Sequence, residues 1–247
     1  MKIAVITDQH LDARKGNPAF WEFFQKFYDN IFFPTLEKEG VDTVMDLGDT
    51  FDNRKTIDFN TYNRITENYF SRLKDYKVHM ILGNHCTYYK NTNKINSPEL
   101  LLDKYENFTV YAEATEIKLG SKNFLMLPWI NKENQKNVTK LLETSNADIC
   151  AGHLELAGFE MTPGLMMDHG MDRNLFHRFN RVWTGHYHHK SKHGNIQYLG
   201  NPYQITWSDN KDPRGFHIFD TESRELEFIQ NPYEMFYKIY YDCLLYT

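Results

Sequence analysis

Apolar and polar positions divide the first third of the chain into alternating short and long segments. The apolar runs at residues 2–7, 42–47 and 77–82 are short and continuous, which is typical of strands buried on both faces. Between them, residues 17–38 and 59–75 place aromatic and aliphatic side chains at helical spacing. The resulting order of strand, helix, strand, helix and strand predicts a parallel sheet with right-handed crossover connections.

The rest of the chain has a different pattern, in which the apolar runs are shorter and more numerous. It predicts helices at 132–145 and 171–178. Together the two parts predict an α/β fold, in which a two-sheet β-sandwich is flanked by helices on its outer faces. The further strands are expected near residues 109–118, 123–127, 148–152, 181–184, 196–199, 215–220 and 225–229.

Length and composition indicate one folded domain. The chain has 247 residues, of which 41% are hydrophobic and 15% aromatic, so it can bury a sizeable core and is not a disordered chain. We expect this domain to cover residues 1–230. The composition changes after Asn231-Pro232, and the aromatic segment 231–247 is expected to begin a C-terminal element that this chain does not complete.

Charge and cysteine content narrow the class of protein. The formal net charge is −5, whereas proteins that bind nucleic acid by charge alone are usually basic, so such a role would need bound cations and a local basic patch. The cysteines Cys86, Cys150 and Cys243 fit no zinc or disulfide framework, which favours a reducing, cytoplasmic location. No apolar run is long enough to span a membrane, and the N-terminus lacks the pattern of a signal peptide.

Five short motifs with chemically active side chains share one position, directly after a predicted strand. Ligands of α/β sheets collect at the carboxyl ends of strands, so these motifs are expected to converge. Glycines within them allow the sharp turns and close approach that convergence requires. The motifs are Asp8-Gln9-His10, Gly48-Asp49-Thr50-Phe51-Asp52, Gly83-Asn84-His85-Cys86, Gly152-His153 and Gly185-His186-Tyr187-His188.

Each motif alone is a weak signal, because a single histidine is more often a core or surface residue than a ligand. The complete set supplies three carboxylates, one amide and five imidazoles, and only Cys86 would add sulfur. Oxygen and nitrogen donors in this mixture suit manganese, iron or zinc. No purely structural reason accounts for all five motifs at equivalent strand ends, so the sequence predicts a metal centre.

In this order, the motifs resemble those of the calcineurin-like metallophosphoesterase superfamily over residues 1 to about 220, a fold with four layers in the order α/β/β/α. Within it, the chain resembles the SbcD-type nuclease subunits of double-strand-break repair complexes, and more closely the recombination nucleases of T-even phages. The narrower resemblance rests on three further segments: Asn84-His85 leading into Tyr88-Tyr89-Lys90-Asn91, Gly152-His153-Leu154-Glu155-Leu156, and Gly200-Asn201-Pro202-Tyr203 followed by Asp212-Pro213-Arg214-Gly215-Phe216.

The resemblance implies two divalent metal ions, expected to be Mn²⁺. Two such ions about 3.5–4 Å apart clamp an in-line displacement at phosphorus, and a metal-bound water is the nucleophile. No protein nucleophile is needed. By resemblance, the first metal is held by Asp8, His10 and His188, the second by Asn84, His153 and His186, and both by Asp49.

The resemblance places His85 outside the metal shell, where it steadies the transition-state charge or protonates the leaving oxygen. Asp52 would orient the imidazole of His85 and favour its charged form. The family usually has Asp or Glu directly after Asn-His, and this chain has Cys86 there. Cys86 is a neutral change, a natural or engineered inactivating change, or a thiolate that contacts a metal; we expect weakened but real activity.

Several basic and aromatic residues have two interpretations. Arg54 and Lys55 follow the second motif and either contact DNA phosphates or are simply solvated, and Lys190 would extend the same basic patch. The aromatic stripes at 17–31 and 62–73 are more often core than interface. The resemblance nevertheless implies a homodimer formed through helices of this region, which would place two active sites on one duplex.

The sequence therefore predicts a Mn²⁺-dependent DNA exonuclease and endonuclease. By resemblance it acts in double-strand-break repair and recombination with an SMC-like ATPase of the SbcC type, in the cytoplasm, or in the host cytoplasm if a phage encodes it. The alternatives are a phosphoesterase on small-molecule or protein phosphates and a form weakened by Cys86. A member of the fold that has lost its metals is disfavoured, because all seven expected ligands are present.

Overall fold

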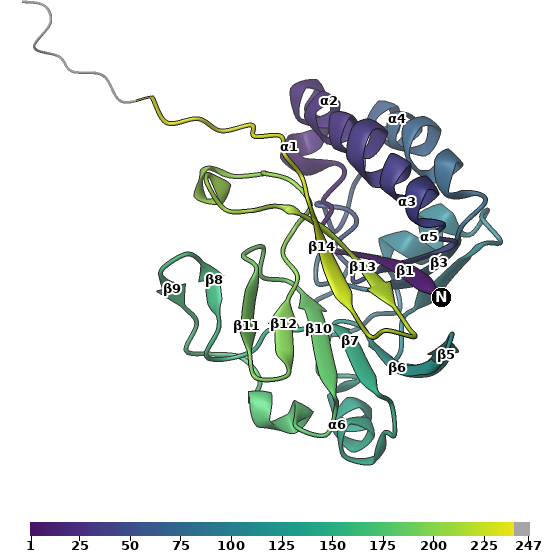
Figure 1. The fold of residues 1–247 in the computed structure, drawn as a ribbon, viewed down its shortest axis with the longest axis vertical. Coiled ribbons are helices and arrows are strands. Elements are labelled where there is room, and N and C mark those ends of the chain that lie inside the picture. Colours follow the sequence, from purple (N-terminus) through teal and green to yellow (C-terminus); the bar gives the residue numbers. More distant parts are fainter. Residues whose placement is uncertain (240–247) are drawn as a thin grey trace, which may run out of the picture.

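The computed structural model describes residues 1–239, which form two six-stranded sheets packed face to face (Figure 1). The first sheet has the strand order β14-β13-β1-β2-β3-β4. Strands β1 to β4 are parallel, and β13 and β14 extend the sheet in antiparallel pairing. Its strands are β1 (Lys2–Ile6), β2 (Thr43–Asp46), β3 (Lys77–Ile81), β4 (Phe108–Tyr111), β13 (Gly215–Asp220) and β14 (Leu226–Gln230).

The second sheet has the strand order β11-β12-β10-β7-β6-β5. Its four inner strands are parallel, and each edge strand pairs in the antiparallel direction. A separate hairpin of β8 (Glu160–Thr162) and β9 (Leu165–Met166) lies beside it. The strands of the sheet are β5 (Thr115–Leu119), β6 (Lys122–Leu127), β7 (Ile149–His153), β10 (Arg181–Gly185), β11 (Ser191–His193) and β12 (Ile196–Tyr198).

Helices cover the outer faces of both sheets. Helices α2, α3 and α4 lie over the first sheet, and α6 lies on the second (Figure 1). A π-helical turn joins α2 to α3, with the Phe33 N–H donating to the Tyr28 carbonyl, and this wider turn accommodates Pro34, which has no N–H to donate. The helices are α1 (Ala13–Gly16), α2 (Pro18–Phe27), α3 (Phe33–Glu39), α4 (Phe59–Asn68), α5 (Ser97–Leu102) and α6 (Gln135–Thr144).

Three apolar layers hold these elements together. Side chains alternate along β1, so that Ile3 and Val5 pack between the two sheets while Ala4 and Ile6 pack against the helices. A third cluster, which includes Val138, packs α6 against the second sheet. Because β1 is buried on both faces, its sequence is continuously apolar rather than alternating.

The predicted α/β fold with a two-sheet sandwich and outer helices is confirmed. Two predicted elements are wrong. The strand predicted at 109–118 is two strands, β4 and β5, because the chain crosses there from one sheet to the other. The helix predicted at 171–178 is only a 3₁₀ turn at Arg173–Phe176. Helix α5, strand β11 and the β8–β9 hairpin were not predicted, since they are too short to show a period.

The aromatic stripes of the first helices belong to the core. Phe24, Phe27 and Tyr69 are fully buried, and the Phe24 ring stacks on Tyr203 with centroids 3.8 Å apart. The predicted C-terminal element at 231–247 lies only partly within the described residues, and residues 231–239 contain no helix or strand. A domain boundary near residue 230 therefore stays a prediction. None of the helices within residues 1–239 combines the length and the apolar character needed to cross a membrane.

Candidate metal centre

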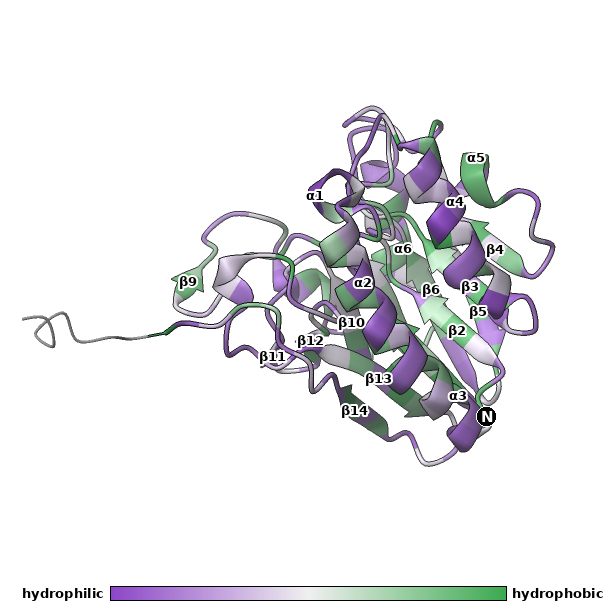
Figure 2. Ribbon diagram, turned by 90° about the horizontal axis from the view of Figure 1, so that it is seen from above, coloured by the Kyte–Doolittle hydropathy of each residue, from purple (hydrophilic) through white to green (hydrophobic). Residues whose placement is uncertain are grey.

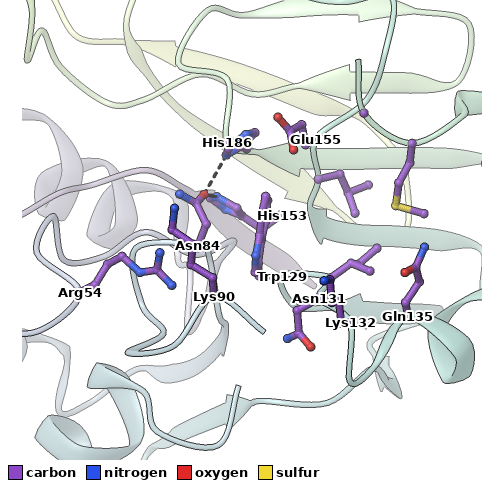
Figure 3. A pocket seen from close by; sticks show the side chains of 14 residues that line it. Arg54, Asn84, Lys90, Trp129, Asn131, Lys132, Gln135, His153, Glu155 and His186 are labelled. Atoms are coloured by element: carbon purple, nitrogen blue, oxygen red, sulfur yellow. Dashed lines mark hydrogen bonds between the residues drawn. The ribbon is translucent and has the colours of Figure 1, made fainter. Parts of the chain in front are cut away.

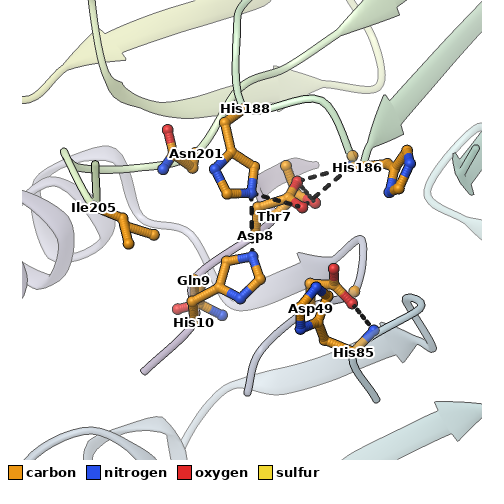
Figure 4. Close-up of polar contacts among 12 residues, drawn as sticks. Thr7, Asp8, Gln9, His10, Asp49, His85, His186, His188, Asn201 and Ile205 are labelled. Atoms are coloured by element: carbon orange, nitrogen blue, oxygen red, sulfur yellow. Dashed lines mark hydrogen bonds and ion pairs between the residues drawn. The ribbon is translucent and has the colours of Figure 1, made fainter. Parts of the chain in front are cut away.

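Seven side chains from both sheets converge where the parallel strands end; Figure 4 labels five of them, and Figure 3 labels Asn84 and His153. The first sheet contributes residues that follow β1, β2 and β3, and the second sheet contributes residues that end or follow β7 and β10. The predicted convergence at strand ends is therefore present, and it involves both sheets rather than one. The seven residues are Asp8, His10, Asp49, Asn84, His153, His186 and His188.

The first ligand group consists of Asp8, His10 and His188. Each residue offers one nitrogen or oxygen atom, and these atoms lie within 4.8 Å of one another. The Nε2 atoms of His10 and His188 are 3.2 Å apart, and His188 Nε2 is 3.8 Å from Asp8 Oδ1. Both imidazoles thus direct the same ring nitrogen to one point beside a buried carboxylate.

The second ligand group consists of Asn84, His153 and His186. The Asn84 Oδ1 atom lies 3.2 Å from His153 Nε2 and 2.8 Å from His186 Nδ1. Asp49 Oδ2 is 3.3 Å from His153 Nε2, and Asp49, His153 and Asp8 form another cluster of donor atoms within 4.8 Å. Asp49 therefore lies between the two groups, at the position expected of a bridging ligand.

Hydrogen bonds from outside the cluster fix the orientation of its side chains. His153 Nδ1 lies 2.8 Å from the Leu47 carbonyl, so this nitrogen donates its proton and Nε2 faces the centre. Thr7 Oγ1 donates to Asp8 Oδ2 at 2.8 Å, and the His186 N–H donates to the same carboxylate. The centre is therefore held in place by contacts with both the main chain and neighbouring side chains.

The main chain is strained at the centre. Four of its residues, Asp8, His10, Asp49 and His186, have positive φ angles of 52°, 44°, 55° and 89°. Residues other than glycine rarely adopt this conformation, and each instance costs on the order of 1–3 kcal/mol unless the surroundings impose it. The strain turns each side chain inward at the end of its strand, which is why the ligands meet at one point.

Burial and charge shift the pKa values of these groups in opposite directions. Burial alone would raise the pKa of Asp49, but the positive charge of His153 and its hydrogen bond hold that pKa well below its usual range. Burial alone would lower the pKa of His153, but Asp49 and Asp8 raise it to about 9. Burial and the positive charge of His153 lower the pKa of His186 to about 3. The protein alone thus balances its buried carboxylates with a proton on His153.

Comparison with known proteins identifies the fold family. A family model described as calcineurin-like phosphoesterase matches residues 1–232. The chain belongs to this family. The family resemblance drawn from the motifs is thereby confirmed, and with it the assignment of the chain as a hydrolase of phosphate esters.

Two curated relatives and one solved structure show how far the similarity extends. The phosphoesterase is 37% identical over 246 residues to exonuclease subunit 1 of Enterobacteria phage T4, covering 98% of this chain and 71% of that protein. It is 24% identical over 281 residues to the D component of the nuclease SbcCD from Staphylococcus epidermidis, covering 95% of this chain and 73% of that protein. A dimetal phosphatase from Danio rerio shares the fold, with a TM-score of 0.50 and 13% identity over 88% of this chain and 91% of that one.

The donor set of this phosphoesterase fits divalent metal ions. Asp8 and Asp49 are fully buried, and within residues 1–239 their ion pairs are with histidines only, not with lysine or arginine. Metal–ligand bonds of about 2.1 Å place neighbouring ligand atoms about 3 Å apart, close to the spacings within the two ligand groups. Carboxylate, amide and imidazole donors suit borderline divalent cations, which would also replace the proton on His153.

Asp52 does not contact His85 in the way that the sequence predicted. Its carboxylate Oδ1 lies 3.2 Å from His10 Nδ1, while His85 Nδ1 lies 2.5 Å from the main-chain carbonyl of Asp52. The expected carboxylate–imidazole pair is therefore formed with a residue of the first ligand group. The close approach of the His10 ring holds the pKa of Asp52 below its usual range. Asp52 thus orients an expected metal ligand, an arrangement common around metal sites.

His85 and Cys86 differ in burial: His85 is half-buried, whereas Cys86 is fully buried. The His85 N–H donates to Asp49 Oδ1 at 2.8 Å, and its ring is 5.1 Å from that of His10, which places it beside the centre. Cys86 is fully buried, and burial together with the negative charge of Asp49 raises the pKa of its thiol. Among the described residues, Cys86 belongs to none of the candidate metal-binding clusters. The geometry gives no support to a metal-bound thiolate.

The three basic residues proposed to bind substrate occupy different environments. Arg54 lines a cavity of about 560 Å³ beside the second ligand group, and its guanidinium donates to Thr87 (Figure 3). Lys55 lies over the Tyr88 ring at 5.2 Å, along a neighbouring groove. Lys190 lies 3.2 Å above the Phe228 ring and is half-buried. Of the three, only Arg54 faces the cavity.

Two features of the centre were missed at the level of sequence. Trp129 follows the end of β6, and its ring lies 5.1 Å from that of His186. The strand-end rule that identified the ligands would also have selected this residue. Asp46 is buried beneath the centre, and burial raises its pKa to about 7, although it accepts hydrogen bonds from Gln9 and Thr50. Nothing in the sequence distinguishes it from an ordinary strand residue.

Substitution of Gly185 tests whether close packing shapes the first ligand group. A Cβ at Gly185 would lie 2.0 Å from Thr7 Oγ1 and 2.6 Å from Asp8 Oδ2, so Gly185→Ala must displace the Asp8 carboxylate. We expect metal affinity, measured by isothermal titration, to fall by about 10- to 100-fold, the usual cost of losing an orienting contact. Gly194→Ala is the control, because a Cβ there contacts no ligand and the strain of alanine at its φ of 60° would lower stability without touching the centre. Equal effects of the two substitutions would contradict this interpretation.

Proposed function

We propose that this phosphoesterase is a DNA nuclease, with both exonuclease and endonuclease activity, that uses two divalent cations, Mn²⁺ in the cell. The observation that carries the proposal is the meeting of two ligand groups at Asp49, in a chain 37% identical to a phage exonuclease subunit over 98% of its length. The first group is Asp8, His10 and His188, and the second is Asn84, His153 and His186. When bound, the ions supply Lewis acidity and a water of lowered pKa.

The protein's own residues would position the substrate and move the proton. His85 is tethered at its N–H by Asp49 and at Nδ1 by the Asp52 carbonyl, so its Nε2 remains available. Nδ1–H donates to the carbonyl, and a proton on Nε2 would be held for the leaving oxygen or for the charge of the transition state. Asp52 would act through His10 by fixing its ring, which makes it a positioning residue rather than a catalytic one.

The wider role that we propose follows from the relatives. Two curated relatives are named as the D component of the nuclease SbcCD. We infer that this chain likewise acts with an SMC-like ATPase of the SbcC type, in double-strand-break repair and recombination, and in the cytoplasm where its DNA would lie. Residues 1–230 would be the nuclease domain.

Cleavage assays with metal analysis test the nuclease proposal. We expect the Mn²⁺-loaded protein to cleave labelled single-stranded and duplex DNA, and to contain two ions per chain. Asp49→Ala should abolish both DNA cleavage and the binding of two ions. The cleavage rate should fall by more than the roughly 100-fold that is lost when a residue that only orients a metal ligand is removed. Asp75→Ala, at an exposed position on the helical side, should change neither. Hydrolysis of only an aryl phosphodiester would instead support the alternative, a phosphoesterase on small-molecule or protein phosphates.

We further propose that Cys86 lowers the turnover rate. A buried, neutral thiol follows His85, where the family usually has a carboxylate that could favour a charged imidazole. Cys86→Asp should raise kcat on DNA by about tenfold, a part of the roughly 10²–10⁴-fold that general acid–base catalysis contributes. Cys86→Ser, which keeps the size and adds no charge, should not. If Cys86→Asp folds and binds metal but is no faster, the proposal fails.

The homodimer that we propose would use an apolar surface on α5 rather than the buried aromatic stripes. Leu100 on α5 is 71% exposed and Phe59, at the start of α4, is 88% exposed, and α5 stands out as an apolar segment at the surface (Figure 2). Leu100 lines one groove together with the exposed residues Ile95 and Tyr88, and contiguous exposed apolar surface of this kind marks interaction sites. Leu100→Glu should convert a dimer into a monomer in light scattering, whereas Leu165→Glu, on the β8–β9 hairpin, should not. A wild-type monomer at high concentration would contradict the proposal.

A further inference from the structure

We propose that the cavity beside the second ligand group is a subsite for one unpaired nucleotide. The base of this nucleotide would lie against Trp129, and its flanking phosphate would contact basic side chains of the cavity wall. The inference deepens the proposed nuclease function and rests on it. It assigns the substrate class at this subsite as a single-stranded nucleotide next to the scissile phosphate. Trp129 would determine this preference.

The position of the Trp129 ring is the first observation. Trp129 follows β6 and is half-buried, and its ring lies 5.1 Å from that of His186 and 6.1 Å from that of His153. The indole is thus a wall shared by the cavity and the second ligand group (Figure 3). A nucleotide whose phosphate reached these ligands would bring its base or sugar to this wall. Stacking on aromatic rings is the usual sequence-tolerant way to hold an unpaired base.

The main chain around Trp129 is rigidly held, which is unusual for a surface loop. The Trp129 carbonyl accepts hydrogen bonds from Asn93 Nδ2 at 3.1 Å and from Asn134 Nδ2 at 3.0 Å. Asn131 Nδ2 donates to Asn93 Oδ1 at 2.9 Å, and the Trp129 N–H donates to the Leu82 carbonyl at 2.7 Å. The three asparagines are buried. The indole is therefore presented by a preorganised support that leaves part of its surface exposed.

The charge of the cavity is the third observation. Its wall carries Arg54, Lys90 and Lys132 against a single acid, Glu155. Glu155 lies 3.4 Å from His169, and no ion pair within residues 1–239 engages any of the three cations. In a chain of net charge −5, this local excess of positive charge fits a ligand with more than one phosphate.

The size of the cavity favours one nucleotide over a base pair. Its volume of about 560 Å³ is within the range of roughly 300–1,000 Å³ typical of sites for one small organic ligand. A duplex would therefore have to separate its terminal pair for one strand to enter. The apolar part of the wall, formed by Trp129, Ile130 and Met171, would contact the base and sugar while the cations contact the backbone.

Cleavage of oligonucleotides with and without a base tests the role of Trp129. The full-length, metal-loaded protein is given single-stranded DNA in which the nucleotide next to the cleaved bond is either normal or an abasic analogue. We expect the wild-type protein to prefer the normal substrate by about tenfold in kcat/KM, the range that stacking provides. Trp129→Ala should reduce this ratio to about one and Trp129→Phe should keep most of it. Trp207→Ala, at an exposed tryptophan that does not line the cavity, should leave it unchanged.

The same ratio separates a binding role from a merely structural one. If Trp129 only supports His186, Trp129→Ala will slow both substrates equally and the ratio will stay at its wild-type value, which overturns the proposal. A wild-type ratio near one overturns it as well.

The basic side chains of the cavity are tested by the salt dependence of KM. Lys132→Gln should lower the slope of log KM against log salt concentration by about 0.7, as expected for one lost contact to a single strand. Lys136→Gln, on α6 but outside the cavity lining, is the matched control.

A binding experiment keeps this proposal distinct from the nuclease proposal. If the wild-type protein cleaves no oligonucleotide, the nuclease function fails, but isothermal titration calorimetry can still report occupancy of the subsite in the wild type and in the variant. Deoxyadenosine monophosphate should then bind at least about tenfold more tightly than 2-deoxyribose 5-phosphate to the wild-type protein, and with equal affinity to Trp129→Ala. Equal binding of the two probes to the wild-type protein would overturn the subsite.

Discussion

The burial of two carboxylates between the sheets is the constraint on which the rest of this structure depends. Asp8 and Asp49 lie where the sheets meet, and no lysine or arginine pairs with them in the described chain. Buried charge is costly unless it is paired and hydrogen-bonded. Histidines from the opposite sheet provide the compensation, with His153 Nε2 only 3.3 Å from Asp49. The packing of one sheet on the other therefore depends on the electrostatics of the centre. Bound cations would compensate the buried negative charge more completely than the proton on His153 does.

This constraint accounts for the unusual backbone at the strand ends. An ordinary turn would direct the side chains of Asp8 and Asp49 away from the opposite sheet, so both adopt positive φ. Glycines supply the remaining space: a Cβ at Gly83 would lie 2.1 Å from Asp49 Oδ1, and one at Gly185 would lie 2.6 Å from Asp8 Oδ2. The strain is concentrated where chemistry is expected, and the extensive apolar layers on either side of each sheet can sustain it.

The sequence revealed the ligands better than it revealed their surroundings. Each ligand follows a strand with a clear apolar pattern, and parallel strands bring their carboxyl ends together, so convergence could be predicted without knowing any loop. The histidine that pairs with Asp52 could not be predicted, because the choice between His10 and His85 depends on how the segment after β2 turns. The support of Trp129 was equally hidden, since Asn93 and Asn134 are far apart in sequence and resemble ordinary loop residues. The strand predicted at 109–118 was wrong for a related reason: a change of sheet leaves no periodic signal.

The net charge of −5 argues at first sight against a nucleic-acid substrate, and the distribution of charge removes that objection. Charges farther apart than about 8 Å are largely screened at physiological salt, so a phosphate at the centre responds to its immediate neighbours. Two divalent cations would outweigh the two buried carboxylates there. Beyond them, the cavity beside the second ligand group adds the positive charges of Arg54 and Lys132, whereas Lys190 is held over Phe228. An acidic protein can thus attract a phosphate chain locally, where the charges next to the metals are positive.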